Sequence, residues 1–141
     1  MVESKLIEYL SELVAINSVN PNLSDQGQGE KEIAEYIHFH FKKLGFDSHI
    51  FEVAKDRCNT TSFIAGKKSS KALLMNGHID TVGIEDMDSP FILRQDGDRL
   101  YGRGAYDMLA GCAIQMCLAD FFAVNENPIS SFLVIFEKRN N

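Results

Sequence analysis

The chain has 141 residues, 45% of them hydrophobic, and a formal net charge of -6, values that permit one folded domain with its own core and argue against wholesale disorder. The mild acidity gives no electrostatic reason to expect nucleic acid or an anionic membrane as a partner, and we expect neither. Three cysteines do not make a disulfide framework, and no signal peptide or apolar run of transmembrane length is visible, so we expect a reducing, cytoplasmic location.

Two helices are predicted in the first third of the chain. Apolar residues recur with helical spacing over 3–16 and again over 30–44, after which Gly45 stands where a helix stop belongs. The stretch between them, 17–29, is rich in Asn, Ser, Gly and Gln and is expected to form a loop.

Short apolar runs after the second helix predict strands. They cover 49–53, 60–65 and 72–75, and the last is entirely apolar, which is typical of a strand buried on both faces. Residues 91–93 and 99–101 flank a polar turn that contains glycine, and we expect them to pair as a hairpin.

A long helix over 107–124 and a buried strand over 132–136 complete the pattern. Helices therefore alternate with buried strands, which predicts the α/β class with a largely parallel or mixed sheet. We expect three layers, with helices on both faces of the sheet. No repeat or linker divides the chain, so residues 1–141 are expected to form one domain, or part of one, without a second domain.

The segment around His78 is the first candidate site. A buried apolar strand is expected to run into Gly77, His78 and Asp80, and side chains two apart in an extended chain point to the same face. Ligands usually bind at the ends of such strands, where His78 fits a metal ligand and Asp80 fits the carboxylate that accepts the second N–H of its ring. The alternative is a solvated His-x-Asp pair in a loop.

The segment that leads to Asp107 is the second candidate site. Gly102 and Gly104 permit a close approach of the backbone to a ligand, and Asp107 follows at the start of the predicted helix. Asp107 fits either a helix N-cap or a carboxylate that bridges two metal ions. A nucleotide-binding loop is disfavoured, because the glycine spacing differs from Gly-x-Gly-x-x-Gly and a carboxylate would repel phosphate. In the same helix, Cys112 and Cys117 are expected to be small buried apolar residues.

Four segments of the chain resemble the M20 metallopeptidases, the family that includes acetylornithine deacetylase, succinyl-diaminopimelate desuccinylase and aminoacylase. They follow the order and separation of that family's motifs, and they comprise residues 16–21, 29–46, 76–82 and 101–108. The resemblance covers nearly the whole chain, which is identified as a member of the family and as the N-terminal part of its catalytic domain.

The resemblance implies an enzyme, a metal-dependent amidohydrolase or peptidase. His78 and Asp107 would be metal ligands, with Asp107 bridging two ions, and Asp80 would be a catalytic residue that orients His78. The implied cofactor is zinc, as one or two ions, with cobalt as an alternative metal. A metal-bound water would attack the amide carbonyl of an N-acyl amino acid or small peptide while a glutamate takes its proton. A homodimer is an open option for the full-length parent.

The chain also departs from the family pattern. Leu109 stands where the family often has Lys. The family's two adjacent glutamates, a general base and a metal ligand, would fall near Arg139 and Asn140, and Glu137 lies too early to be assigned the role of base.

The family's later carboxylate ligand, its distant histidine and its lid domain have no counterpart in the sequence. Each zinc would then have about two protein ligands, where catalytic zinc usually has three, so we do not expect turnover by these residues alone. The alternative hypothesis is a truncated product that is catalytically inactive or binds a partner.

Overall fold

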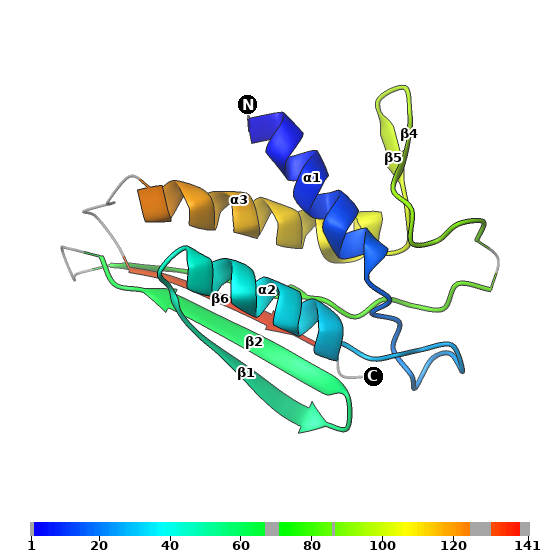
Figure 1. Cartoon of the computed structure of the whole chain (residues 1–141), viewed down its shortest axis with the longest axis horizontal. Coiled ribbons are helices and arrows are strands. Elements are labelled where there is room, and N and C mark those ends of the chain that lie inside the picture. The colour runs from blue at the N-terminus through cyan, green and yellow to red at the C-terminus, as the bar shows by residue number, and fades with distance from the viewer. Residues whose placement is uncertain (1, 67–70, 86, 125–130, 139–141) are drawn as a thin grey trace.

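The computed structural model of the chain describes residues 2–66, 71–85, 87–124 and 131–138. In chain order these contain the elements shown in Figure 1, namely α1 (Val2–Ala15), α2 (Lys31–Lys43), β1 (Asp47–Ala54), β2 (Arg57–Ile64), β3 (Ala72–His78), β4 (Arg94–Asp96), β5 (Arg99–Tyr101), the short π-helical turn η1 (Ala105–Leu109), α3 (Ala110–Val124) and β6 (Ser131–Glu137).

Four strands form a mixed sheet in the order β1-β2-β6-β3. The β1–β2 and β2–β6 pairs are antiparallel and the β6–β3 pair is parallel, which confirms the predicted mixed sheet. Strands β4 and β5 form a separate hairpin that projects away from the rest of the chain (Figure 1). Because β3 and β6 run in the same direction, their carboxyl ends meet at one edge of the sheet, where His78 is the register partner of Glu137.

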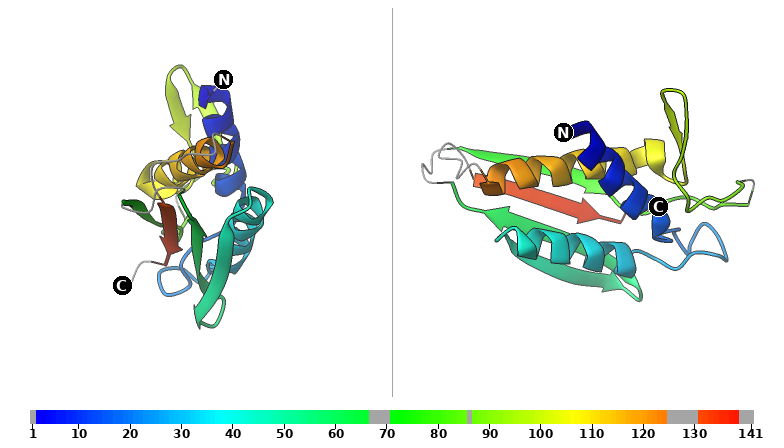
Figure 2. Two further views of the ribbon diagram at one scale, coloured as in Figure 1. Left: turned by 90° about the vertical axis from the view of Figure 1, so that its left-hand side faces the viewer. Right: turned by 45° about the horizontal axis from the view of Figure 1, so that its top comes forward.

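All three described helices lie on one face of the sheet (Figure 2). Helix α2 packs on β1 and β2, α3 packs on β6 and β3, and α1 crosses α3. Phe132, Val134 and Phe136 of β6 are fully buried beneath the helices, while the residues between them are partly exposed. The α/β class is confirmed, and one of the two predicted helix layers is present within the described ranges.

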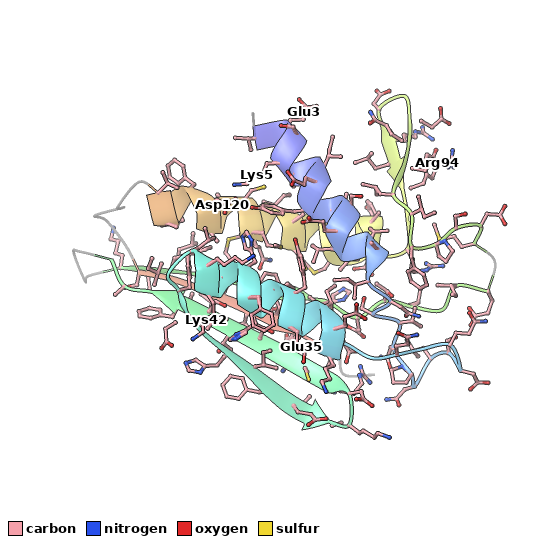
Figure 3. The ribbon with its side chains drawn as sticks, in the orientation of Figure 1. Glu3, Lys5, Glu35, Lys42, Arg94 and Asp120 are labelled. Atoms are coloured by element: carbon pink, nitrogen blue, oxygen red, sulfur yellow. The ribbon has the colours of Figure 1, made fainter. Side chains whose placement is uncertain are left out.

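A buried acid joins α1 to α3. Asp120 of α3 accepts a hydrogen bond of 2.6 Å from the Tyr9 hydroxyl, and Lys5 lies 2.6 Å from the same carboxylate (Figure 3). Burial, reinforced by the Asp120 carboxylate, raises the pKa of Tyr9, so the phenol stays protonated and remains a donor. This contact fixes α1 across α3 at a distance from the strand ends.

The prediction that residues 72–75 are buried on both faces is wrong. Leu73 and Leu74 are 41% and 58% exposed, because β3 is an outer strand whose neighbour in the described sheet is β6. An apolar run indicates that a strand can be buried, but it does not indicate which neighbours cover it. Leu74, Leu133 and Phe63 are register partners on three adjacent strands, so they form an apolar strip on the face opposite the helices.

Several element boundaries also differ from the prediction; β2 begins three residues earlier than expected, and β3 continues three residues further, to His78. The first hairpin strand is Arg94–Asp96, three residues later than expected, because the turn is the two-residue pair of Gly97 and Asp98. Gly97 adopts φ 59°, a left-handed conformation that suits such a turn. The long helix α3 begins at Ala110, three residues after Asp107.

Residues Ala105–Val124, which comprise η1 and α3, reach a mean hydropathy of 1.5 and are long and apolar enough to span a membrane by length and composition alone, although the non-helical angles of Asp107 and Met108 interrupt the helix. The expectation that no run of this length exists is therefore wrong. A helix packed against both a sheet and another helix also reaches this hydropathy, and Cys112, Ala113 and Met116 on its inner side are fully buried. The absence of a membrane partner stays a prediction.

We predict that the substitution Leu74→Lys reduces self-association of the chain. An outer strand beside an exposed apolar strip favours pairing between copies, and a lysine at such an edge opposes it. Sedimentation velocity is expected to show oligomers for the wild type and a shift toward monomer for the variant. The control is Ile92→Lys, at a loop residue that is 66% exposed. A monomeric wild type, or an equal effect of Ile92→Lys, contradicts the prediction.

Candidate metal centre

His78 is the last residue of β3, and the glycine before it brings α3 close to the end of the strand. A Cβ atom on Gly77 would lie 3.0 Å from Nε2 of Gln115 and 3.3 Å from Sγ of Cys112. Cys112 donates a hydrogen bond of 3.3 Å to the His78 carbonyl, and burial raises the pKa of its thiol to about 12. Cys112 therefore supports the backbone of His78 as a neutral thiol, in agreement with the prediction that it is a small buried residue. Cys117, for which burial is also predicted, is only partly buried.

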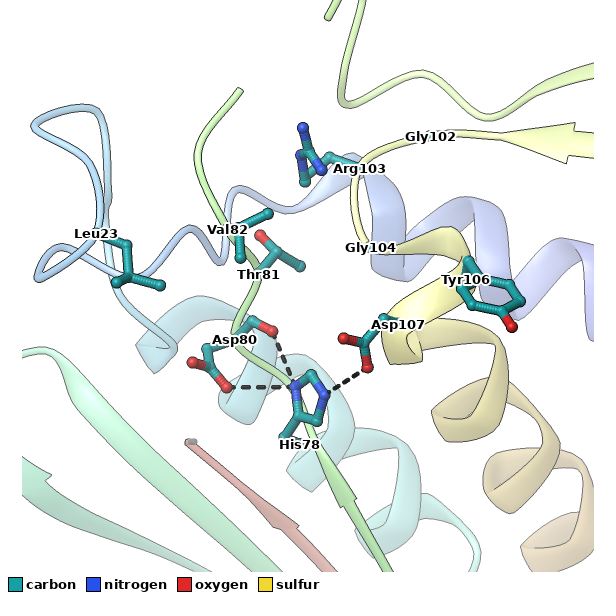
Figure 4. Close-up of a pocket in the computed structure, with 10 residues that line it drawn as sticks. All are labelled: Leu23, His78, Asp80, Thr81, Val82, Gly102, Arg103, Gly104, Tyr106 and Asp107. Atoms are coloured by element: carbon teal, nitrogen blue, oxygen red, sulfur yellow. Dashed lines mark hydrogen bonds and ion pairs between the residues drawn. The ribbon is translucent and has the colours of Figure 1, made fainter. Parts of the chain in front are cut away.

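The imidazole of His78 is held from both sides (Figure 4). Its Nδ1 atom lies 3.1 Å from the backbone carbonyl of Asp80 and 3.4 Å from Oδ1 of the same residue. A carbonyl oxygen only accepts hydrogen bonds, so Nδ1 carries a proton and donates. The other ring nitrogen, Nε2, lies 2.9 Å from Oδ1 of Asp107. The ring is thus fixed in the orientation that presents Nε2 to the Asp107 carboxylate.

Asp107 belongs to a loop that packs tightly on the segment after β3. Gly104 adopts φ 75°, and a Cβ atom on it would lie 2.5 Å from Cγ2 of Thr81. A side chain at position 104 would therefore push the loop away from the extension of β3 and separate Asp107 from His78.

The N-cap role for Asp107 is not observed. Asp107 and Met108 both have non-helical backbone angles, and α3 begins only at Ala110. The peptide bond between Asp107 and Met108 is cis. The Asp107 side chain is 59% exposed and is directed to the His78 ring. Its position suits contact with a ligand in the pocket and does not suit capping of α3.

The three residues predicted as a site line one pocket of about 260 Å³. The pocket opens between the end of β3, the loop before η1 and the loop after α1, and its lining consists of Leu23, His78, Asp80, Thr81, Val82, Gly102, Arg103, Gly104, Tyr106 and Asp107 (Figure 4). The chemical roles assigned to His78, Asp80 and Asp107 stay predictions, but their proximity is a property of the structure.

The donor pair fits a metal ion. Two ligands of a tetrahedral zinc, each about 2.0–2.1 Å from the ion, lie roughly 3.3–3.4 Å apart. Nε2 of His78 and Oδ1 of Asp107 are 2.9 Å apart, so a small shift lets both reach one ion. Within the described ranges no group of three or more His, Cys, Asp and Glu side chains could hold a metal. The described site therefore offers two ligands, fewer than the three protein ligands usual for catalytic zinc.

The positions predicted for the paired glutamates, Arg139 and Asn140, lie outside the described residues. Glu137 is described, and it lies beside His78 in the strand register without lining the pocket. Its Oε1 atom accepts a hydrogen bond of 3.3 Å from Nδ2 of Asn76. No general base is thus assigned among the described residues.

Three buried residues behind Asp80 are not predicted as site residues by the sequence pattern. Asn20 donates a hydrogen bond of 3.1 Å to Oδ2 of Asp80, and Nη2 of Arg57 lies 3.9 Å from the same oxygen. Nε of Arg57 in turn contacts both carboxylate oxygens of Glu30, at 2.8 and 2.5 Å. Burial raises the pKa of Glu30, and the Arg57 guanidinium opposes that rise. The sequence offers one signal for them, which is that Glu30 and Arg57 stand at or beside the predicted helix and strands, where a charged residue could become buried.

Comparison with known proteins gives a consistent picture. Residues 74–137 match the family model described as Peptidase family M20/M25/M40. A probable succinyl-diaminopimelate desuccinylase of Staphylococcus aureus (strain MRSA252) is 30% identical over 131 residues, which are 89% of this chain and 30% of that protein. An acetylornithine deacetylase of Erwinia tasmaniensis is 29% identical over 105 residues, which are 72% of this chain and 27% of that protein. The chain therefore spans about 30% of the length of the curated relatives it matches.

Solved structures share the fold. Human carnosine dipeptidase 1 superposes with a TM-score of 0.78 at 17% identity, covering 96% of this chain and 32% of that one. An M20 family metallo-carboxypeptidase from Sulfolobus solfataricus superposes with a TM-score of 0.76 at 22% identity, covering 94% of this chain and 30% of that one. The family predicted from the four motifs is confirmed by these matches, and the chain belongs to the M20 peptidase family.

Proposed function

We propose that the protein carries part of the metal centre of a hydrolase that cleaves amide bonds in N-acyl amino acids or small peptides, with zinc as the metal. The observation that carries the proposal is the 2.9 Å contact between Nε2 of His78 and Oδ1 of Asp107 inside a pocket. Membership of a peptidase family supports the reaction class. The names of the relatives, a desuccinylase and a deacetylase, support an acyl amino acid as substrate.

Each of the three residues has a separate task in the proposed centre. His78 would hold the metal through Nε2, and Asp107 would hold it through its carboxylate, whose second oxygen would be available to a second ion. Asp80 keeps the Nδ1 proton of His78 in place, which leaves Nε2 for the metal. A bound divalent ion in such a site polarises an amide carbonyl and lowers the pKa of a water molecule, which makes a nucleophile available near neutral pH.

A second candidate function is favoured by the small number of ligands. His78 and Asp107 are two ligands, and the described part of the chain adds no third His, Cys, Asp or Glu to them. A product with this centre alone would hold metal without turnover, or would bind a partner. We therefore propose metal binding as the property of the 141 residues and hydrolysis as the property of a centre with further ligands.

We predict that the chain binds zinc. His78→Gln or Asp107→Asn is expected to weaken zinc binding more than about 100-fold, because each change removes a metal ligand, and loss of a residue that only contacts a ligand already costs about 10–100-fold. Isothermal titration calorimetry measures the affinity and the number of ions per chain.

The chain contains a matched control for this experiment. His49 and Asp47 on β1 form another His–Asp contact of 2.9 Å, but both side chains are largely exposed and lie outside the pocket. His49→Gln is therefore expected to leave zinc binding unchanged. Equal affinities of the wild type and His78→Gln, or a loss confined to His49→Gln, would show that the metal binds elsewhere.

We further predict that the zinc-loaded chain does not hydrolyse N-acetyl or N-succinyl amino acids at a rate above that of free zinc. The reason is that the described residues offer two ligands, which leave the metal exchangeable, and that no general base is assigned among them. A ninhydrin assay for released amine measures turnover. Hydrolysis that disappears on chelation and in His78→Gln would contradict this expectation and would mean that these residues form a complete centre.

A further inference from the structure

Four buried polar residues extend inward from the pocket. Asn20, Glu30, Arg57 and Asp80 are each no more than 4% exposed, and they come from three segments of the chain, namely the connection between α1 and α2, the start of β2 and the residues after β3. Three of them carry charge, which is an unusual content for the interior of a small α/β chain. The four residues are called the Arg57 cluster here.

The backbone brings these segments together independently of the side chains. The amide of Asn20 donates to the Thr81 carbonyl at 2.9 Å, and the amide of Thr81 donates to the Ser18 carbonyl at 3.0 Å. The amide of Glu30 donates to the Asp56 carbonyl at 2.9 Å. The extension of β3, the loop after α1 and the turn before β2 therefore form one rigid base beneath His78.

Within this base the Asp80 carboxylate is fixed in one rotation. Its Oδ2 atom accepts from Asn20 and faces Nη2 of Arg57, while its Oδ1 atom faces Nδ1 of His78 at 3.4 Å. A rotation of the carboxylate out of this plane would weaken its contacts with Asn20, Arg57 and His78 together. The orientation of the oxygen that meets His78 therefore depends on Asn20 and Arg57, which contact the other oxygen.

A gain in stability alone does not explain the ionic content of the cluster. A buried ion pair contributes little net stability, because desolvation offsets the attraction, and an apolar pair of similar volume is often as stable. Nη2 of Arg57 is buried without a hydrogen-bond partner among the described residues and faces Asp80, so its charge acts on Asp80 through space. A buried guanidinium that faces a carboxylate in this way can orient it, whereas a side chain that only filled the core would not need the charge.

We propose that Arg57 is a positioning residue for the metal centre. Held by Glu30, its guanidinium fixes the Asp80 carboxylate, and Asp80 in turn fixes the His78 ring with Nε2 directed at Asp107. The inference rests on the proposed function in one respect, since it assigns the purpose of this orientation to metal binding. The orientation of His78 itself can be measured without metal.

The test removes the cluster's two opposite charges together. The double substitution Glu30→Gln/Arg57→Met removes both partners of the Glu30–Arg57 ion pair together, and Asp80 keeps its contacts with Asn20 and His78, so the chain is expected to fold. Zinc affinity is expected to fall about 10–100-fold, the usual cost of losing an outer contact to a metal ligand. Arg57→Lys keeps the charge but lacks the planar fork, and an intermediate loss is expected. In an Asp80→Asn background the Glu30→Gln/Arg57→Met pair is expected to cause no further loss, because Arg57 acts through Asp80.

A second measurement needs no metal. Proton NMR of the metal-free wild type is expected to show the Nδ1–H proton of His78 protected from exchange with water, and this signal is expected to disappear in Glu30→Gln/Arg57→Met. Tyr9→Phe is the control, since it removes the buried hydrogen bond to Asp120 far from the pocket. It is expected to lower thermal stability while zinc affinity and the His78 signal remain as in the wild type.

The possible outcomes separate the two proposals. If Glu30→Gln/Arg57→Met keeps both the wild-type zinc affinity and the protected Nδ1–H proton, Arg57 has only a structural role and the inference is overturned. If its losses add to those of Asp80→Asn, Arg57 does not act through Asp80 and the inference also fails. If the wild type binds no zinc, the proposed function fails, and the NMR comparison still decides whether Arg57 positions His78.

Discussion

The close approach of η1 to the end of β3 is the constraint on which the rest of the site depends. It brings an imidazole and a carboxylate that are 29 residues apart in sequence to within 2.9 Å of each other. The approach is sterically possible because Gly77 and Gly104 carry no side chain where α3, η1 and Thr81 come closest. The strand supplies a rigid histidine, and the loop supplies an aspartate whose backbone has left helical geometry to reach it.

The interior behind His78 is organised around the same contact. Burial of Glu30, Arg57 and Asp80 places charges where an apolar core would normally lie. We assign to these charges the orientation of the Asp80 carboxylate, because a buried ion pair contributes little net stability. A further buried acid among the described residues, Asp120, ties α1 to α3 and does not line the pocket. The chain thus contains one polar cluster that we assign to the site and one that only joins helices.

Much of this arrangement could be predicted from the sequence, and the failures have a common cause. The spacing of apolar residues predicted the helices, a largely parallel or mixed sheet and the place of His78 after a strand, because one-sided burial leaves a local pattern. The spacing of apolar residues could not reveal that Leu73 and Leu74 are exposed, since their exposure depends on which elements cover β3. It also could not reveal the role of Arg57, because its partners Glu30 and Asp80 come from distant segments and no local spacing connects them.

Anomalous X-ray diffraction at the zinc absorption edge can decide whether His78 and Asp107 share a metal ion. Crystals of the chain grown with zinc are predicted to show an anomalous peak between the two side chains, within about 2.2 Å of both Nε2 of His78 and an oxygen of Asp107. Zinc bound only at other positions, with this pocket holding no anomalous peak, would contradict the account.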